Sequence, residues 1–528
     1  MTERRQNADM KAFYITTPLY YVNAKAHIGH SYTNIASDTI ARFHRIKGED
    51  VFLMTGTDEH GLKVEEASLK AGFKEGEEKK FVDGMVKSFK DLWKRLFIEY
   101  DFFIRTTDDF HKTAVKKALD LLYKKGDIYK DKYDGWYCTP CENFWAKNQL
   151  TEPICPDCKR PIEMISESNY FFKLSKYQKW LISYIESHPD FIMPKSRRNE
   201  VLGFLKNPLN DLCISRPRRR LKWGIDMPFD KDYVVYVWFD ALLNYISGPG
   251  YAKDEKKFKR TWPADFQLIG KDILRHHAVY WPIMLHAMGL EPPRTVFAHG
   301  WWTIGGEKMS KSKGNIVDPF EMIDKYGVDA YRYFLLREMP FGADGTFSEK
   351  AFVTRFNSDL ANDLGNLLNR TLTMVDKYFG GEVPNPPKKM SDSKLENLSA
   401  ELKEAAAGLW ARMDTSMQTL AFCGCLTSVW EILNRANKYI EEVKPWVLSK
   451  EGKKGDLENV IYNLVETQRI TTASLWPFMP GTCETIWNRL GLKGKPSDTK
   501  CKDISVWGKT KPGAKVNKGA PLFPRIVD

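Results

Sequence analysis

The sequence predicts a mixed α/β protein in which a parallel sheet is interrupted by an inserted segment and followed by a helical region. Strand and helix patterns alternate up to about residue 107, stop between about 108 and 233, and resume up to about 301. From about residue 351 onward, helical periods replace the strand patterns. The 528 residues, 43% of them hydrophobic, are enough for more than one buried core, so we expect several domains.

The first elements of the predicted sheet follow one another in order. The segment 12–18, AFYITTP, has the composition of a strand, and we expect it to stop at its proline. A helical period runs from Ser31 to Lys47 with its apolar residues on one face, and Gly48 ends it. The segment 50–57, DVFLMTGT, is the next strand. This order of strand, loop, helix and strand is typical of a parallel α/β domain.

Later segments show how the chain is divided. Strand and helix patterns return in YVVYVWFDALL, FQLIGKDILRHHAVYWPIML and TVFAHGWW, which indicates that the segment before them is inserted into the sheet domain. Long helical periods follow, and the last residues resemble an extended tail. We therefore expect the first half of the sheet domain at 1–107, the insertion at 108–233, the second half at 234–301, a lysine-rich loop and linker at 302–350, and a helical domain with the tail at 351–528.

Charge and hydrophobicity narrow the class of protein. The net charge of +12 favours an acidic partner such as nucleic acid, although a basic surface that binds nothing is the alternative. The N-terminus lacks the apolar stretch of a signal peptide, and the longest apolar run, 233–239, is too short to cross a membrane. We therefore expect a soluble, cytoplasmic chain without membrane partners. Because the sequence ends at LFPRIVD with no appended domain, we also expect a monomer.

The motif HIGH, His27–His30, lies between the first predicted strand and the first predicted helix, where parallel α/β domains bind ligands. The N–H groups and partial positive charge at the start of a helix suit a phosphate. Gly29 would let a ligand approach the backbone, and His27 and His30 can each donate a hydrogen bond to a phosphate oxygen. Two incidental loop histidines are the alternative, but the context favours nucleotide binding.

The segment 306–315, GEKMSKSKGN, carries three lysines and two serines between glycines and has no hydrophobic period. Lysine ammonium groups are compact charges that can stabilise the negative charge that develops in phosphoryl-type transfer. The glycines would allow such a loop to close over bound phosphates. Taken alone, however, the segment is equally typical of a solvated turn.

HIGH early in the chain, followed by KMSKS at Lys308–Ser312, resembles the class I aminoacyl-tRNA synthetase family. The segments TPLYYVNAKAHIGH, TGTDEHG, YVWFDALLNY, GKDILRHHAVYWP and EKMSKSKGN resemble its methionyl branch, and the resemblance covers nearly the whole chain. It implies a Rossmann-like catalytic domain, an inserted connective domain with a zinc knuckle, and an α-helical anticodon-binding bundle. It also implies that ATP, accompanied by Mg²⁺, activates L-methionine to methionyl-adenylate, and that methionine then passes to tRNA(Met) for translation initiation and elongation.

The resemblance also assigns residues to a methionine site. Ile273, His277 and Trp281 are spaced i, i+4, i+8, which would place them on one helical face, although Pro282 must leave a backbone bond unmade. A thioether packs well against aromatic and aliphatic side chains, whereas spacing alone would favour an ordinary core. Asp58 would hold the α-ammonium group. The implied methionine site is Leu19, Tyr21, Asp58, Trp238, Ala241, Leu242, Tyr245, Ile273, His277 and Trp281.

The resemblance implies that the lysine loop and the two histidines are catalytic. Lys308 and Lys311 would close over the phosphates, with Lys311 the stronger candidate, while Ser310 and Ser312 would support the loop. The implied catalytic residues are His27, His30, Lys308 and Lys311.

Further residues are implied to contact ATP. Gly270 and Asp272 would meet the ribose, although Asp272 could equally be an ordinary helix N-cap. Arg216 would steady the lysine loop and the phosphates, while Arg218–Arg220 form either a solvated basic face or a contact with the tRNA backbone. The implied ATP site is His27, Gly29, His30, Arg216, Gly270, Asp272, Lys308 and Lys311.

Two C-x-x-C pairs, CTPC and CPDC, are separated by thirteen intervening residues in the predicted insertion. Four thiolates can surround zinc tetrahedrally and close every coordination position, which makes such a site structural. Four thiols without metal are the alternative, and a redox role is disfavoured because neither pair opens a helix after a strand. We expect one structural Zn²⁺ at Cys138, Cys141, Cys155 and Cys158.

In the helical region, Asn366 and Arg370 lie one helical turn apart, and Trp446 follows a helix break. Asparagine and arginine can hydrogen-bond unstacked base edges, and tryptophan offers a stacking face. The resemblance implies that these three residues read the CAU anticodon; without it, Trp446 would be interpreted as a packing residue.

Three alternative functions are less consistent with the sequence. Leucyl, isoleucyl and valyl synthetases need a much larger editing insertion than 108–233, and a cysteinyl enzyme would place zinc in its amino-acid pocket. A non-catalytic tRNA-binding protein with a degenerate nucleotide fold is disfavoured by the intact histidine and lysine motifs.

Overall fold

The structure, a computed structural model, describes residues 11–23, 25–138, 143–146, 150, 152–156, 159–305, 307–308, 317–385 and 389–527. Of residues 143–146, 307 and 308, it describes the backbone. Internal contacts divide the chain into two compact units. The first contains the residues up to Ala26 together with Asp50–Lys94 and Glu99–His299, and the second contains His27–Glu49, Arg95–Ile98 and the residues from Gly300 onward.

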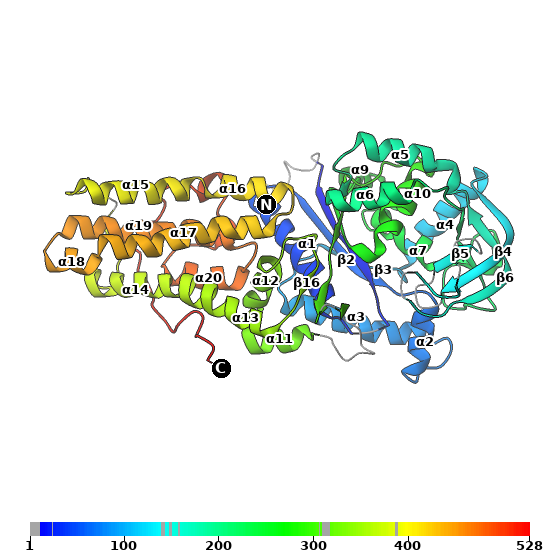
Figure 1. The fold of residues 1–528 in the computed structure, drawn as a ribbon, viewed down its shortest axis with the longest axis horizontal. Helices are drawn as coiled ribbons and strands as arrows, with labels where there is room; N and C mark the ends of the chain where they lie inside the picture. The colour runs from blue at the N-terminus through cyan, green and yellow to red at the C-terminus, as the bar shows by residue number, and fades with distance from the viewer. Residues whose placement is uncertain are drawn as a thin grey trace. The chain divides into compact units, whose positions relative to one another are not determined.

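The first unit is built on a six-stranded sheet in the order β3-β2-β1-β12-β13-β7, in which all neighbouring strands are parallel (Figure 1). The chain adds β2 and β3 on one side of β1 and later returns to add β12 on the other. The order of the strands therefore reverses at β1, and ligands bind outside the carboxyl ends of the strands at such a point. The strands are β1 (Phe13–Tyr21), β2 (Val51–Asp58), β3 (Phe102–Arg105), β7 (Ile192–Met193), β12 (Phe266–Gly270) and β13 (Thr295–His299).

Helices fill the connections between these strands, as parallel pairing requires, and all of them except α1 (Ile28–Ile46) belong mainly to the first unit. Their apolar faces form one continuous core with the sheet, which includes Tyr14, Leu242 and Trp281. The helices are α2 (Leu62–Lys70), α3 (Glu78–Arg95), α4 (Asp109–Lys124), α5 (Gln178–Ser187), α6 (Lys195–Phe204), α7 (Val237–Leu242), α8 (Asn244–Ser247), α9 (Glu255–Thr261) and α10 (Trp281–Ala287).

The prediction that the first strand stops at its proline is wrong. Strand β1 continues through Pro18 to Tyr21, and its register against β2 shifts between Thr16 and Leu19. Proline has no N–H to give to a ladder, and an irregularity in the pairing accommodates it. The shift carries β1 further, so that Leu19 and Tyr21 belong to the strand itself.

The predicted insertion forms antiparallel sheets of its own. One has the order β5-β4-β6-β8 and the other has the order β10-β11-β9. Strand β7 also lies within residues 108–233, yet it pairs with β13 at the edge of the parallel sheet. The antiparallel strands are β4 (Ile128–Cys138), β5 (Asn143–Ala146), β6 (Glu163–Phe172), β8 (Leu212–Cys213), β9 (Ser215–Pro217), β10 (Asp226–Met227) and β11 (Asp230–Val235).

The second unit is mainly helical, as predicted for the region after about residue 351. Helices α15, α17 and α19 run side by side (Figure 1), and nearly every residue of α19 is buried. A small sheet holds β14 (Trp302–Ile304), β15 (Glu307–Lys308) and β16 (Gly345–Thr346). The helices are α1 (Ile28–Ile46), α11 (Pro319–Tyr326), α12 (Val328–Arg337), α13 (Glu349–Arg355), α14 (Asn366–Phe379), α15 (Ser393–Ala407), α16 (Leu409–Gln418), α17 (Phe422–Val443), α18 (Pro445–Lys450), α19 (Lys454–Leu475), α20 (Pro480–Arg489) and α21 (Cys501–Ile504), with a π-helix at Phe356–Gly365.

A buried charge cluster joins α1 to the rest of the second unit. Asp38 of α1 accepts hydrogen bonds from Arg42 at 2.8 Å and from Arg332 of α12 at 2.7 Å. The side chains of Asp38 and Arg332 are fully buried. Arg332 also donates to backbone carbonyl groups, so its charge is solvated entirely by the protein. The carbonyl oxygens that accept from Arg332 are those of Leu96, Pro477 and Phe478.

Candidate functional site

An aromatic cluster in the first unit contains several residues predicted to bind methionine. The Trp238 ring meets the rings of Tyr21 and His277 edge-on, with centroids 6.3 Å apart in each pair. The Tyr245 ring contacts those of His277 and Trp281, with centroids 5.6 and 5.9 Å apart. The cluster therefore draws on β1, α7, α8 and the segment that ends in α10.

Hydrogen bonds fix the protonation of His277. Its Nδ1 lies 2.9 Å from the carbonyl oxygen of Ile273, which can only accept, so Nδ1 carries a proton. Its Nε2 lies 2.8 Å from the Tyr245 hydroxyl and accepts from it. Burial lowers the pKa of His277 to about 4. Near neutral pH, His277 is therefore an uncharged imidazole that is held on both sides.

The segment that carries His277 is not the regular helix that the sequence predicts. A π-helix spans His276–Tyr280, and α10 begins at Trp281. The Trp281 N–H donates to the carbonyl oxygen of His276, five residues back. Pro282 follows with no N–H to continue an α-helical ladder. The predicted α-helical face is therefore wrong, although Tyr245 still contacts two of its three members.

His276 is a residue of this cluster that the sequence pattern missed. Its ring stacks on that of Trp238 with centroids 3.8 Å apart and an interplanar angle of 22°. Burial lowers its pKa well below the usual value, and the neighbouring His277 and Arg275 side chains lower it further. The signal was the adjacent histidine pair in ILRHHAVYW, but an assumed α-helical period gave only one of the two a place in the site.

The predicted methionine residues fall into two groups by exposure. One group is partly exposed, whereas the other is buried. The partly exposed residues are Leu19, Tyr21, Trp238 and Ile273, and the buried ones are Asp58, Ala241, Leu242, Tyr245, His277 and Trp281.

The turn after β2 is anchored immediately beyond Asp58. Glu59 is fully buried and accepts two hydrogen bonds from the Arg105 guanidinium at 2.6 and 2.9 Å. The hydroxyl of Thr107 donates to the same carboxylate at 2.5 Å. The Gly61 N–H donates to the carbonyl oxygen of Trp223. Asp58, at the carboxyl end of β2, therefore stands on a turn whose backbone is held at several points.

In the second unit, the two motif histidines form a capping box at the start of α1. The Gly29 N–H donates to Nδ1 of His27 at 3.1 Å, and the His27 N–H donates to Nδ1 of His30 at 3.0 Å. Since each Nδ1 accepts, the proton of each neutral ring lies on Nε2. Both rings can thus donate through Nε2, and a Cβ on Gly29 would lie 3.0 Å from Cε1 of His27. The cap thereby fixes two donors suited to phosphate oxygens.

Two of the other predicted ATP residues, Gly270 and Lys308, lie at the ends of strands. Gly270 ends β12, and Asp272 follows it with an exposed side chain, which places a carboxylate at the carboxyl edge of the sheet. In the second unit, the backbone of Lys308 pairs with Thr303 of β14. Lys311 lies outside the described residues. The roles predicted for both lysines therefore stay predictions.

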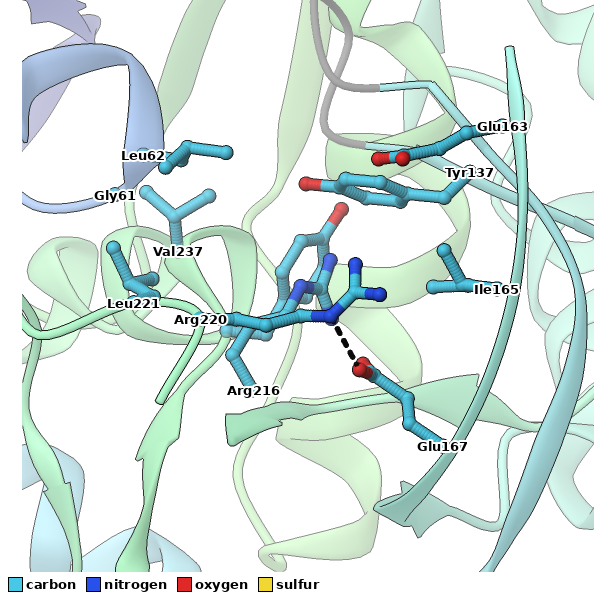
Figure 2. Close-up of a pocket in the computed structure, with 11 residues that line it drawn as sticks. Gly61, Leu62, Tyr137, Glu163, Ile165, Glu167, Arg216, Arg220, Leu221 and Val237 are labelled. Atoms are coloured by element: carbon cyan, nitrogen blue, oxygen red, sulfur yellow. Dashed lines mark ion pairs between the residues drawn. The ribbon is translucent and has the colours of Figure 1, made fainter. Parts of the chain in front are cut away.

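Arg216 lies in β9, beside a cavity of about 140 Å³ in the first unit. Its guanidinium carbon is 4.8 Å from the ring centroid of Tyr137 and 4.9 Å from that of Tyr236. Figure 2 shows Arg220 in the same cavity, where its Nε lies 2.9 Å from a carboxylate oxygen of Glu167. Arg216 is thus held between aromatic rings, and its predicted contact with the lysine loop stays a prediction.

The structure describes two of the four predicted zinc ligands. Cys138 ends β4, and Cys155 lies in the segment before β6; both are buried. The Lys159 N–H donates to the carbonyl oxygen of Cys155 at 2.9 Å. Cys141 and Cys158 lie outside the described residues. Among the residues that are described, no group of three or more metal-binding side chains is found.

The residues predicted to read an anticodon all lie in the helical bundle. Asn366 begins α14 and is exposed, and Arg370 follows one turn later. The Arg370 guanidinium pairs with Glu441 of α17 at 2.5 Å. Trp446, in α18, is 45% exposed, so its ring presents a face that a base could stack on.

The family model described as tRNA synthetases class I (M) matches residues 13–164 and 147–372, which include the parallel sheet and the histidine-capped helix. No helix within the described part of the chain is long and apolar enough to span a membrane.

Known proteins narrow this class. The chain is 51% identical over 523 residues to the methionine–tRNA ligase of Caldanaerobacter subterraneus, covering 98% of this chain and 79% of that protein. It is 47% identical over 519 residues to the methionine–tRNA ligase of Thermotoga maritima, covering 97% and 80%. The structure of Mycobacterium tuberculosis methionyl-tRNA synthetase in complex with methionyl-adenylate matches with a TM-score of 0.91 at 42% identity, covering 98% of this chain and all of that one. The chain belongs to the methionine–tRNA ligase family of class I synthetases, and the predicted family and fold class are confirmed.

Proposed function

We propose that this chain catalyses ATP-dependent activation of L-methionine to methionyl-adenylate and transfer of the methionyl group to tRNA(Met). The observation that carries this proposal is the similarity, along nearly the whole chain, to a methionyl-tRNA synthetase solved with methionyl-adenylate. The aromatic cluster and Asp58 offer an apolar wall and a carboxylate, which suit the thioether and the ammonium group of methionine.

The phosphate chemistry is assigned to the histidines and the lysine loop. The methionine carboxylate attacks the α-phosphorus of ATP in line, the bond to the bridging oxygen breaks, and pyrophosphate leaves. His27 and His30 donate through Nε2 to phosphate oxygens, while Lys308 and Lys311 neutralise charge that develops on the leaving group. Mg²⁺ bound to ATP supplies further neutralisation. Gly270 and Asp272 contact the ribose, and Arg216 completes the ATP site.

We assign one structural zinc to Cys138, Cys141, Cys155 and Cys158. The burial of Cys138 and Cys155 supports this assignment, since thiolates of a closed zinc site are shielded from water. Metal analysis of the purified protein tests it: one equivalent of zinc, lost when Cys138 and Cys155 are both replaced by serine, is the expected result. Zinc-free protein with unchanged stability would refute it.

For the tRNA, we assign anticodon reading to Asn366, Arg370 and Trp446, and we place the enzyme in the cytoplasm as a monomer. The exposed ring of Trp446 and the spacing of Asn366 and Arg370 on α14 support the first assignment. Trp446→Ala should raise the KM for tRNA while leaving pyrophosphate exchange unchanged. Light scattering at working concentration tests the oligomeric state.

The activity is tested by exchange of pyrophosphate into ATP. Methionine should support exchange, whereas leucine, valine and cysteine should not. Exchange without preference for methionine would refute the substrate, and no exchange with any amino acid would refute the activity.

The role of the lysine loop is tested separately. Lys311→Ala should lower the exchange rate by roughly 10²- to 10³-fold, as loss of a positioned transition-state charge does. Lys313→Ala, at the next lysine of the same loop, should have a much smaller effect. Equal exchange rates in the two variants would remove Lys311 from the mechanism.

A further inference from the structure

A buried carboxylate in the first unit joins several elements around the proposed methionine site, and the chemistry above does not use it. Asp240 lies in α7, two residues after Trp238, and is 1% exposed. Its Oδ2 lies 2.7 Å from Nδ1 of His60, and its Oδ1 lies 2.8 Å from Nε2 of His111. Since an ionised carboxylate only accepts, both histidine nitrogens carry protons. Asp240 therefore ties the turn after β2 and helix α4 to α7.

The second ring nitrogen of His111 also has a hydrogen-bond partner. Its Nδ1 lies 2.8 Å from the Ser247 hydroxyl in α8. With the proton on Nε2, a neutral His111 accepts from Ser247 at Nδ1. Burial acts to raise the pKa of Asp240, but His60 and His111 outweigh it and hold the pKa below its usual value. The group is thus a carboxylate with a donor at each oxygen.

His60 connects this carboxylate to the residue proposed to hold the methionine ammonium group. It stands two residues after Asp58, and Glu59 between them is anchored to Arg105. The His60 ring also meets the Trp223 ring edge-on, with centroids 5.5 Å apart. The position of the Asp58 turn is therefore set by Glu59 from one side and by the bond from His60 to Asp240 from the other.

We propose that Asp240 is a positioning residue for methionine, which fixes the turn that carries Asp58 through His60 and fixes Trp238 through their shared helix. This inference rests on the proposed methionine site. Methionine would be held at its ammonium group by Asp58 and at its thioether by Trp238, so these two residues must keep a fixed position relative to each other. Asp240 is bonded to the turn that carries Asp58 and lies in the same helix as Trp238. Its loss therefore disturbs methionine binding more than ATP binding.

Pyrophosphate exchange by the Asp240→Asn variant tests whether Asp240 fixes the position of Asp58 relative to Trp238. The amide accepts from one histidine but must donate toward the other, so one of the two bonds requires a new tautomer. The KM for methionine should rise about tenfold, as loss of a charge-assisted hydrogen bond would produce. The KM for ATP should change by less than about twofold, since the histidine cap belongs to another segment.

Three further variants separate positioning from general loss of structure. Ser247→Ala removes the outermost bond of the same buried chain and should leave the KM for methionine within about twofold. His60→Ala should match Asp240→Asn, whereas His60→Asn, whose amide nitrogen takes the place of Nδ1, should restore most of the methionine affinity. If Asp240→Asn does not fold, the comparison of His60→Ala with His60→Asn tests the inference instead.

Several outcomes would overturn the inference. These are an unchanged KM for methionine in His60→Ala, a rise of this KM in Ser247→Ala as large as in Asp240→Asn, or a KM in His60→Asn as high as in His60→Ala. Failure of the wild-type protein to exchange with methionine would instead refute the proposed function itself.

Discussion

At the scale of single residues, surroundings decide which protonation state each imidazole adopts. His277 donates to one carbonyl oxygen and accepts from one hydroxyl, and burial lowers its pKa to about 4. An unfolded histidine titrates near pH 6.5. Between these two values the unfolded chain binds more protons than the folded one, so the free energy of unfolding falls as the pH falls from about 6.5 toward 4.

We expect His277 to remove roughly 2–3 kcal/mol of stability between pH 7 and pH 4.5, at about 1.4 kcal/mol per pH unit. The His277→Gln variant has no titrating group at this position. Its free energy of unfolding should therefore fall less than that of the wild type over the same pH range, by the amount that His277 contributes. Urea unfolding at the two pH values measures the difference. His188→Gln, at an exposed histidine, is the control and should follow the wild type. Parallel behaviour of His277→Gln and the wild type would contradict the prediction.

Single residues also show the limits of inference from sequence. HIGH and its place before a helix could be found because a cap is local: His27, Gly29 and His30 need only one another. The aromatic cluster is different. The stacking of His276 on Trp238 depends on a π-helix, and the full burial of Trp281 depends on Trp262 and Tyr245, which lie far away in the sequence. A pattern of spacings contains neither fact.

At the scale of elements, the start of α1 is set by the two histidine rings. Gly29→Ala should displace the His27 ring, because the new Cβ would lie 3.0 Å from its Cε1. Loss of the cap costs about 1 kcal/mol of stability. We also expect pyrophosphate exchange to fall at least about tenfold, since the Nε2 donors lose their aim. Melting temperature and exchange rate measure the two effects.

Gly84→Ala is the matched control. Gly84 lies within α3, where an added Cβ would meet no atom of the described residues within 4 Å outside the helix's own backbone. Alanine should therefore stabilise that helix by about 1 kcal/mol and leave exchange unchanged. A Gly29→Ala variant with wild-type exchange would show that the cap does not orient the donors.

Elements were predictable where one local rule governs them. The alternation of strands and helices indicated the parallel sheet, because buried parallel strands and their crossover helices have distinct periods. Pro18 misled the prediction because proline usually ends a strand, and only the register shift against β2 shows how it is tolerated. Likewise, β7 joins the parallel sheet through pairing with β13, a contact between segments about a hundred residues apart.

At the scale of the whole molecule, the cluster around Arg332 joins α1 to α12 and to the turn between α19 and α20. We expect Arg332→Met to destabilise the second unit by about 3–5 kcal/mol, because several buried carbonyl groups lose their donor. Thermal unfolding measures this loss.

An exposed pair offers the comparison. Arg435 lies 3.5 Å from Glu401 in the same unit, and Arg435→Met should cost less than about 1 kcal/mol. Similar melting temperatures for the two variants would show that the Arg332 cluster contributes little.

Helix α1 begins at the histidine pair, yet Asp38 in its middle accepts a hydrogen bond from Arg332 of α12, which also donates to Pro477 in the turn before α20. It cannot open alone without stranding a buried charge, so its amide protons should exchange with deuterium as slowly as those of α12 and α19. The lifetime of the histidine cap would then be set by the slowest-opening cooperative unit of the helical region, and not by the local stability of a surface loop.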